Sequence, residues 1–197
     1  MSNIQQKETH FQVLSRRTCI SFASIPHDET SVIISIVDSD DFVFPNFFRR
    51  KDNGVKAVLR LSFDDVQEYR GMEYYKKDEG LIIERLTDSE NITYETRIFQ
   101  LITKKDAEKI YDFITKWYGK VDLIIVHCNA GISRSSGVCA GIMKGLINDD
   151  TAIFGNPRFH PNTLCYRLVL EEFMSHKKDF LNISNSSNDN SSDSSMS

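Results

Sequence analysis

The fold of this chain is decided by the stretch VHCNAGISRSS, residues 126–136. An apolar, strand-like run ends at His127, a loop of seven residues follows, and the residues from Arg134 onward favour a helix. Such a loop can curl so that its backbone N–H groups point inward at the start of the helix, which attracts an anion without any net charge on the protein. Gly131 allows the backbone geometry that a tight loop demands. The stretch therefore predicts an anion-binding loop between a strand and a helix.

Two side chains of this stretch suit phosphate chemistry. Arg134 carries a planar fork of N–H groups that can hold two phosphate oxygens. Cys128 lies at the start of the predicted helix, where nearby donors and the helix dipole favour the thiolate, the form that attacks phosphorus. Ser135 could donate a hydrogen bond to the sulfur and help it leave in a second step. His127 is expected to orient the loop through a backbone hydrogen bond.

The segment HCNAGISRS, residues 127–135, resembles the HCxxGxxR[ST] signature of the cysteine-dependent protein-tyrosine and dual-specificity phosphatases, and is most similar to the dual-specificity group. The segments VLSR, SVIISI and LRLSFDD resemble a compact microbial and viral branch of this family. All signature positions match, namely His127, Cys128, Gly131, Arg134 and Ser135. A weaker resemblance extends from about residue 11 to 175 and includes Pro161-Asn162, similar to a turn that buttresses the phosphate loop in that family. The resemblance implies Cys128 as nucleophile and a phosphate-binding set made of Asn129, Ala130, Gly131, Ile132, Ser133 and Arg134.

Strand and helix patterns alternate along the chain, which predicts a single α/β domain with a central, mostly parallel sheet flanked by helices. The phosphatase-type phosphate loop lies between a strand and a helix of this domain. Strands are expected at the apolar runs 11–14, 18–22, 31–37, 57–63 and 121–126. Helices are expected to begin near Thr103, Arg134 and Asn162. In the second of these helices, glycines at every fourth position from 137 to 145 predict close packing against a neighbour.

The domain is expected to span residues 11–181, with an inserted hairpin at about 66–102. The hairpin strands are expected at 81–86 and 94–101. Residues 1–10 are polar and predicted to be flexible. The tail at 182–197 is nearly all Ser, Asn and Asp, cannot bury a core, and is predicted to be disordered.

The family also uses an aspartate as general acid, on a loop that follows a strand. Asp65 is preferred here, because LSFDD resembles the family's strand-plus-Asp pattern best when Asp65 takes that position. Asp64 is the neighbouring alternative. Asp88 lies in the expected hairpin turn, where Asp is common for local reasons. Asp106 is accounted for by capping of the helix that Thr103 begins.

Composition narrows the classes of function. The net charge of −4 and pI near 5.7 argue against nucleic acid or an acidic membrane as partner. No apolar run approaches the length of a membrane span. The four cysteines are scattered, and they and the five histidines never cluster as metal sites require, so no metal is expected. No other cofactor is expected either. Cys139 and Cys165 are interpreted as core residues, and a cytoplasmic location is expected.

The substrate class follows from the loop and its family. Lipid phosphatases of the superfamily tend to place lysines inside the loop, whereas this loop interior is Asn-Ala-Gly-Ile-Ser. A phosphorylated protein is therefore the expected partner, with phosphotyrosine, phosphoserine or phosphothreonine and other phosphoesters left open. The oligomeric state is open as well. The alternative function is a pseudophosphatase that binds phosphopeptides with little or no turnover.

Overall fold

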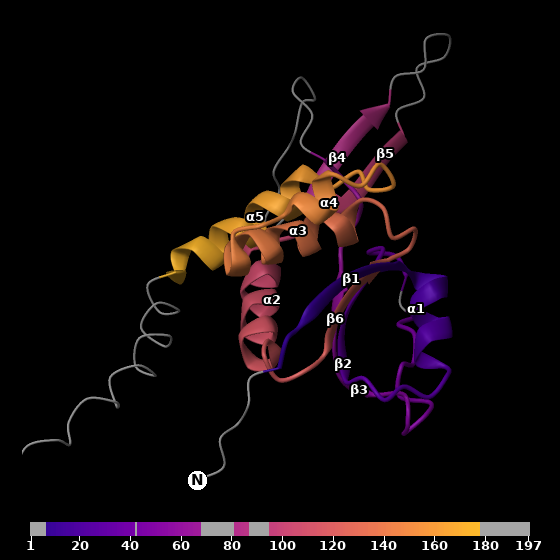
Figure 1. Ribbon diagram of the computed structural model, residues 1–197. Coiled ribbons are helices and arrows are strands. Elements are labelled where there is room, and N and C mark those ends of the chain that lie inside the picture. Colours follow the sequence, from indigo (N-terminus) through magenta and orange to yellow (C-terminus); the bar gives the residue numbers. More distant parts are fainter. Residues whose placement is uncertain (1–6, 42, 68–80, 87–94, 178–197) are drawn as a thin grey trace, which may run out of the picture.

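A computed structural model describes residues 7–41, 43–67, 81–86 and 95–177. Within these residues, four strands form a parallel sheet (Figure 1). Their spatial order is β1 (His10–Ser15), β6 (Leu123–Cys128), β2 (Ser31–Val37) and β3 (Val55–Ser62). The expected fold class is confirmed, since helices flank this sheet and the candidate loop joins β6 to a helix.

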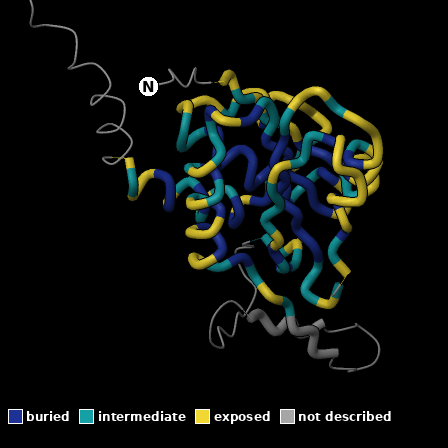
Figure 2. The backbone as a smooth tube through the Cα atoms, turned by 90° about the horizontal axis from the view of Figure 1, so that it is seen from below, coloured by how far each residue is buried: buried dark blue, intermediate teal, exposed yellow. Residues whose placement is uncertain are grey.

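Helices cover both faces of the sheet (Figure 1). One face packs against α1 (Arg16–Ala23), and the contact includes Ile33 of β2 and Ile125 of β6. The other face carries α2 (Lys104–Trp117), α3 (Arg134–Ile147) and α5 (Thr163–Ser175). Side chains alternate between the faces of a strand, so two-sided cover explains why β2 and β6 are apolar almost throughout. The buried backbone lies inside and exposed segments lie around it (Figure 2).

The glycines of α3 lie against α5, as the repeated spacing predicted. A Cβ atom at Gly137 would lie 2.5 Å from the backbone oxygen of Asn162. A Cβ atom at Gly145 would lie 2.3 Å from the Cβ atom of Phe173. Any larger residue at these two positions would push the helices apart, and Asn162, which caps α5, belongs to the candidate site described below.

The prediction of a strand at 18–22 is wrong, because these residues belong to α1. Ser15 caps this helix by accepting a hydrogen bond from the N–H of Thr18 at 3.1 Å. The helix buries Cys19 and Ala23, four residues apart, against the sheet. That spacing is helical, although the alternating β-branched and aromatic residues had favoured a strand. The short helix α4 (Thr151–Phe154) had no counterpart in the sequence prediction.

An antiparallel pair of strands, β4 (Leu81–Leu86) and β5 (Glu95–Gln100), lies where the two hairpin strands were predicted. The segment between these two strands lies outside the described residues, as do the tail at 182–197 and residues 1–6 of the N-terminal segment predicted to be flexible. Residues 7–10 of that segment are held in place, since the backbone N–H of Lys7 donates to the carbonyl of Gly119 at 2.9 Å and His10 begins β1. The helix predicted from Thr103 is α2, with the expected capping box between Thr103 and Asp106. None of the helices in the described ranges is long and apolar enough to span a membrane.

Candidate active site

The predicted loop runs from Cys128, the last residue of β6, to Arg134, the first residue of α3. Gly131 within it has a φ of +71°, in the left-handed region that favours glycine. A Cβ atom there would lie 2.5 Å from the carbonyl carbon of Leu14 and from the backbone nitrogen of Ser15. Glycine is therefore required on two counts, and the loop is seated directly on the end of β1.

The carbonyl groups of the loop are turned outward. Three of them accept hydrogen bonds from backbone N–H groups elsewhere: Asn129 from Arg16 at 3.1 Å, Ile132 from His160 at 3.0 Å and Ser133 from Asn162 at 3.1 Å. In the part of the chain that the structure describes, no protein acceptor meets the N–H groups of residues 130–133. These N–H groups at the start of α3 are thus free to bind an anion, as the loop pattern predicted.

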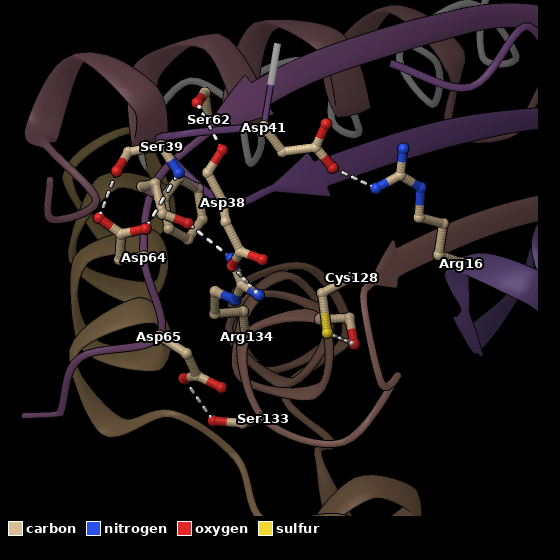
Figure 3. A network of polar contacts seen from close by, with 12 residues as sticks. Arg16, Asp38, Ser39, Asp41, Ser62, Asp64, Asp65, Cys128, Ser133 and Arg134 are labelled. Atoms are coloured by element: carbon tan, nitrogen blue, oxygen red, sulfur yellow. Dashed lines mark hydrogen bonds and ion pairs between the residues drawn. The ribbon is translucent and has the colours of Figure 1, made fainter. Parts of the chain in front are cut away.

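The sulfur of Cys128 lies 3.1 Å from the Oγ of Ser135 (Figure 3). Only 2% of Cys128 is exposed, so this thiol is buried at the point where β6 passes into the loop. The other cysteines behave as core residues: burial raises the pKa of Cys19 and Cys139 to about 12 and raises that of Cys165 as well. Those three remain protonated thiols at neutral pH, and the Ser135 hydroxyl faces the one cysteine that belongs to the loop.

Arg134 is almost fully buried, with 4% of its surface exposed. Its Nη1 donates a hydrogen bond of 2.7 Å to the carbonyl oxygen of Phe63, and its Nη2 forms an ion pair of 2.7 Å with Oδ1 of Asp38 (Figure 3). Among the described residues, the Nε of Arg134 has no hydrogen-bond partner. A buried N–H without a protein partner is costly, and an oxygen of a bound phosphate would satisfy it.

Asp38 was missed by the sequence analysis. One signal could have found it, because Asp38 directly follows the buried run 31–37. The carboxyl ends of parallel strands meet at one edge of a sheet, and the loop after β6 lies at that same edge.

His127 is fully buried, and its ring lies edge-on to that of Phe47, with the ring centres 5.3 Å apart. Its Nε2 lies 2.8 Å from the Oγ of Ser35, and its Nδ1 lies 3.4 Å from the carbonyl oxygen of Cys128. Burial is the main cause that lowers the pKa of His127 to about 4, so the ring is neutral at pH 7. The ring thus anchors the start of the loop to the neighbouring strand, which extends the backbone contact expected for it.

The two aspartates after β3 have different environments (Figure 3). The carboxylate of Asp64 accepts hydrogen bonds from the N–H and Oγ of Ser39 and from the N–H of Gln100. The carboxylate of Asp65 instead accepts from the Oγ of Ser133, a loop residue, at 2.7 Å. Asp64 therefore ties strand ends together, whereas Asp65 lies at the loop. Asp88 lies outside the described residues.

Asn162 connects the parts of the site. Its backbone N–H binds the carbonyl of Ser133, and its Nδ2 donates to Asp65 at 2.9 Å and to the carbonyl of Val66 at 3.1 Å. Its Oδ1 accepts from the N–H of Cys165 and so caps α5. Asn162 is fully buried. This arrangement agrees with the buttressing turn that Pro161-Asn162 resembled.

The fold and the site define an α/β protein with a buried thiol at the start of a loop whose N–H groups are free to bind an anion. Across the described ranges, no group of three or more His, Cys, Asp or Glu side chains could hold a metal ion. No family model matches the chain, and no curated protein matches it.

Solved structures of similar fold exist. PTPMT1 is 15% identical, with 91% of this chain and 97% of that chain covered and a TM-score of 0.48. Tk-PTP in its active form is 14% identical, with coverage of 86% and 92% and a TM-score of 0.46. The human tyrosine phosphatase-like serine/threonine/tyrosine-interacting protein is 17% identical, with coverage of 78% and 80% and a TM-score of 0.42.

Proposed function

We propose that this chain is a phosphoprotein phosphatase, acting on phosphotyrosine or with dual specificity, through a phosphocysteine intermediate. The observation that carries the proposal is the geometry of Arg134. Its guanidinium is buried beside the loop that holds Cys128, and its Nε meets no acceptor among the described residues. A phosphate group bound by the loop N–H groups would supply that acceptor.

The proposed reaction has two steps. The Cys128 thiolate attacks phosphorus, the bond to the substrate oxygen breaks, and Asp65 donates a proton to that oxygen. The loop N–H groups and Arg134 stabilise the charge on the equatorial oxygens. Water then attacks the phosphocysteine, Asp65 takes a proton from it, and the thiolate leaves with a hydrogen bond from Ser135. The chain's own residues supply every group in this scheme, so no cofactor is required.

The proposed substrate is a phosphorylated protein. No lysine lies inside the loop to meet a highly charged head group, and Asp38 and Asp65 both lie beside it. The cysteines in the described ranges are all free thiols, which fits a cytoplasmic location.

The test is turnover by the purified protein. We expect release of inorganic phosphate from p-nitrophenyl phosphate and from a phosphotyrosine or phosphoserine peptide, with the Cys128→Ser variant as the zero-activity control. Equal rates for wild type and Cys128→Ser would contradict the proposal. Tight phosphopeptide binding without release of phosphate would instead support the pseudophosphatase alternative.

A further inference from the structure

The ends of β2 and β3 form a rigid frame at the candidate site. The backbone N–H of Phe63 donates to the carbonyl of Val37 at 3.1 Å, and the Oγ of Ser62 donates to the carbonyl of Asp38 at 3.3 Å. Ser39 donates twice to the carboxylate of Asp64, at 3.0 and 2.6 Å. These hydrogen bonds link the segment that contains Asp38 to the segment that contains Phe63.

Arg134 is attached to this frame at two points. Phe63 accepts from Nη1 and Asp38 accepts from Nη2, each at 2.7 Å. A planar guanidinium that is held at both terminal nitrogens cannot rotate about its long side chain. Its remaining nitrogen, the buried Nε, then has one fixed direction (Figure 3).

The charge of Asp38 also acts on the site. A buried guanidinium needs a compensating charge, and Asp38 supplies it in the absence of substrate. The Asp38 side chain is 37% exposed, so it lies at the edge of the site and not deep in the core. A carboxylate so close to a bound phosphate would by itself weaken anion binding. Removal of Asp38 therefore has two opposite effects on anion binding: loss of the fixed Arg134 orientation weakens it, and loss of the negative charge strengthens it.

We propose that Asp38 is the positioning residue that holds Arg134 in its phosphate-binding orientation, and that this orientation outweighs the repulsion between Asp38 and the anion. The proposal rests on the proposed phosphatase function but concerns a residue outside the phosphate loop and its signature. It predicts that loss of Asp38 slows turnover even though a negative charge has been removed from an anion site.

The test compares two alkylating reagents on Cys128. Iodoacetate is an anion and iodoacetamide is its neutral analogue; in both reactions the sulfur displaces iodide and an S–C bond forms. A correctly oriented Arg134 accelerates only the reaction with iodoacetate, so the ratio of the two rate constants reports the orientation without any need for turnover. The variants are Asp38→Ala, Asp38→Asn and Asp38→Glu, with Asp40→Asn as matched control, because Asp40 is exposed two residues further on.

We expect Asp38→Ala to lower the iodoacetate preference several-fold and kcat on p-nitrophenyl phosphate by about 10²-fold, the usual cost of a misplaced catalytic group. Asp38→Asn, which keeps an acceptor oxygen for Nη2, should lose less, Asp38→Glu should recover part of the loss, and Asp40→Asn should match wild type. Circular dichroism checks folding, and the Asn variant carries the test if the Ala variant does not fold.

Two results would overturn the inference. The first is an iodoacetate preference that rises in Asp38→Ala, which would make Asp38 only a repulsive charge. The second is an iodoacetate preference and a kcat of Asp38→Ala that equal those of Asp40→Asn. A wild-type protein without turnover would defeat the phosphatase proposal alone, since the alkylation ratio would still decide the role of Asp38.

Discussion

The Oγ of Ser133 donates a hydrogen bond of 2.7 Å to Oδ1 of Asp65, so the loop at the start of α3 contacts the segment that follows β3. The same carboxylate oxygen accepts a hydrogen bond from the Nδ2 of Asn162, whose backbone N–H also donates to the carbonyl of Ser133. Asp65 is thus kept at the rim of the loop although its side chain is exposed to solvent. A carboxyl group held there can pass a proton to a departing substrate oxygen.

We predict that Asp65→Asn slows hydrolysis of a phosphopeptide by about 10²–10⁴-fold, the usual worth of a positioned general acid. p-Nitrophenyl phosphate should suffer much less, because its leaving group needs little protonation. Steady-state rates and pH–rate profiles on both substrates check this.

Asp64→Asn and Asp88→Asn are the comparison variants for Asp65. Asp64→Asn should lower stability, because an amide cannot accept all the hydrogen bonds that Asp64 accepts, and should leave the shape of the pH–rate profile intact. If Asp88→Asn alone removes the limb that reports the acid form, the acid lies in the hairpin and Asp65 only positions the loop.

Cys128→Ser is expected to abolish hydrolysis and to leave binding of a phosphate ester measurable, since the loop N–H groups and Arg134 remain. Calorimetry of phosphopeptide binding and a phosphate-release assay measure the two effects. Cys139→Ser is the control, because Cys139 is a buried core thiol. The kcat of this variant should stay near the wild-type value. Wild-type turnover by Cys128→Ser would refute the role of nucleophile.

Arg134→Lys is expected to lose most of the activity with the fold intact. Lysine keeps the positive charge but has neither the planar fork nor an Nε–H, and it cannot bind Phe63 and Asp38 together. Steady-state kinetics together with circular dichroism decide the matter. A kcat close to that of wild type would show that charge alone suffices at this position.

Dilute peroxide should inactivate the protein reversibly, and phosphate or vanadate should protect it. Burial raises the pKa of Cys19, Cys139 and Cys165, so these thiols resist oxidation and damage should concentrate at Cys128. Mass spectrometry of the oxidised protein and recovery of activity with dithiothreitol provide the readout. Inactivation that bound oxyanion does not slow would contradict an activated thiolate in the loop.

The neutral, buried His127 predicts a loss of stability in mild acid. Its pKa is lowered to about 4 in the folded state, so the unfolded chain binds the extra proton first as the pH falls. Stability should be fully present above pH ~6.5, the ordinary pKa of histidine, and should decline toward pH ~4 by on the order of 3 kcal/mol. Urea unfolding between pH 4 and 7 measures this, and His127→Gln should flatten the dependence whereas the exposed His160→Gln should not.

The loop could be predicted from sequence because its parts are neighbours in the chain. The spacing of Cys128, Gly131 and Arg134 describes one turn of backbone and the first residue of a helix, and both features are local. The capping box of α2 and the glycine spacing of α3 were predictable for the same reason.

Two supports of the loop, Ser35 and Asp38, were not predicted, because their contacts depend on which strands are neighbours in the sheet. Ser35 reaches His127 only because β2 lies next to β6, and Asp38 reaches Arg134 only because the same strand ends at the loop. Periodicity along the chain does not contain strand order. At α1 the error was local, since Thr18, Ile20 and Phe22 alternate as in a strand while the buried pair Cys19 and Ala23 is four residues apart.

The strand order β1-β6-β2-β3 governs when this site can form during protein synthesis. In the folded sheet β6 lies between β1 and β2, but a ribosome releases β1 and β2 long before β6. Until β6 is synthesised, the facing edges of β1 and β2 therefore lack the strand that pairs with both. Even after β6 and the loop have emerged, the carbonyls of Ile132 and Ser133 lack their donors until His160 and Asn162 have been translated. Cys128 therefore gains the full surroundings of its loop only when nearly the whole domain is present, and a ribosome-bound fragment has the cysteine without them.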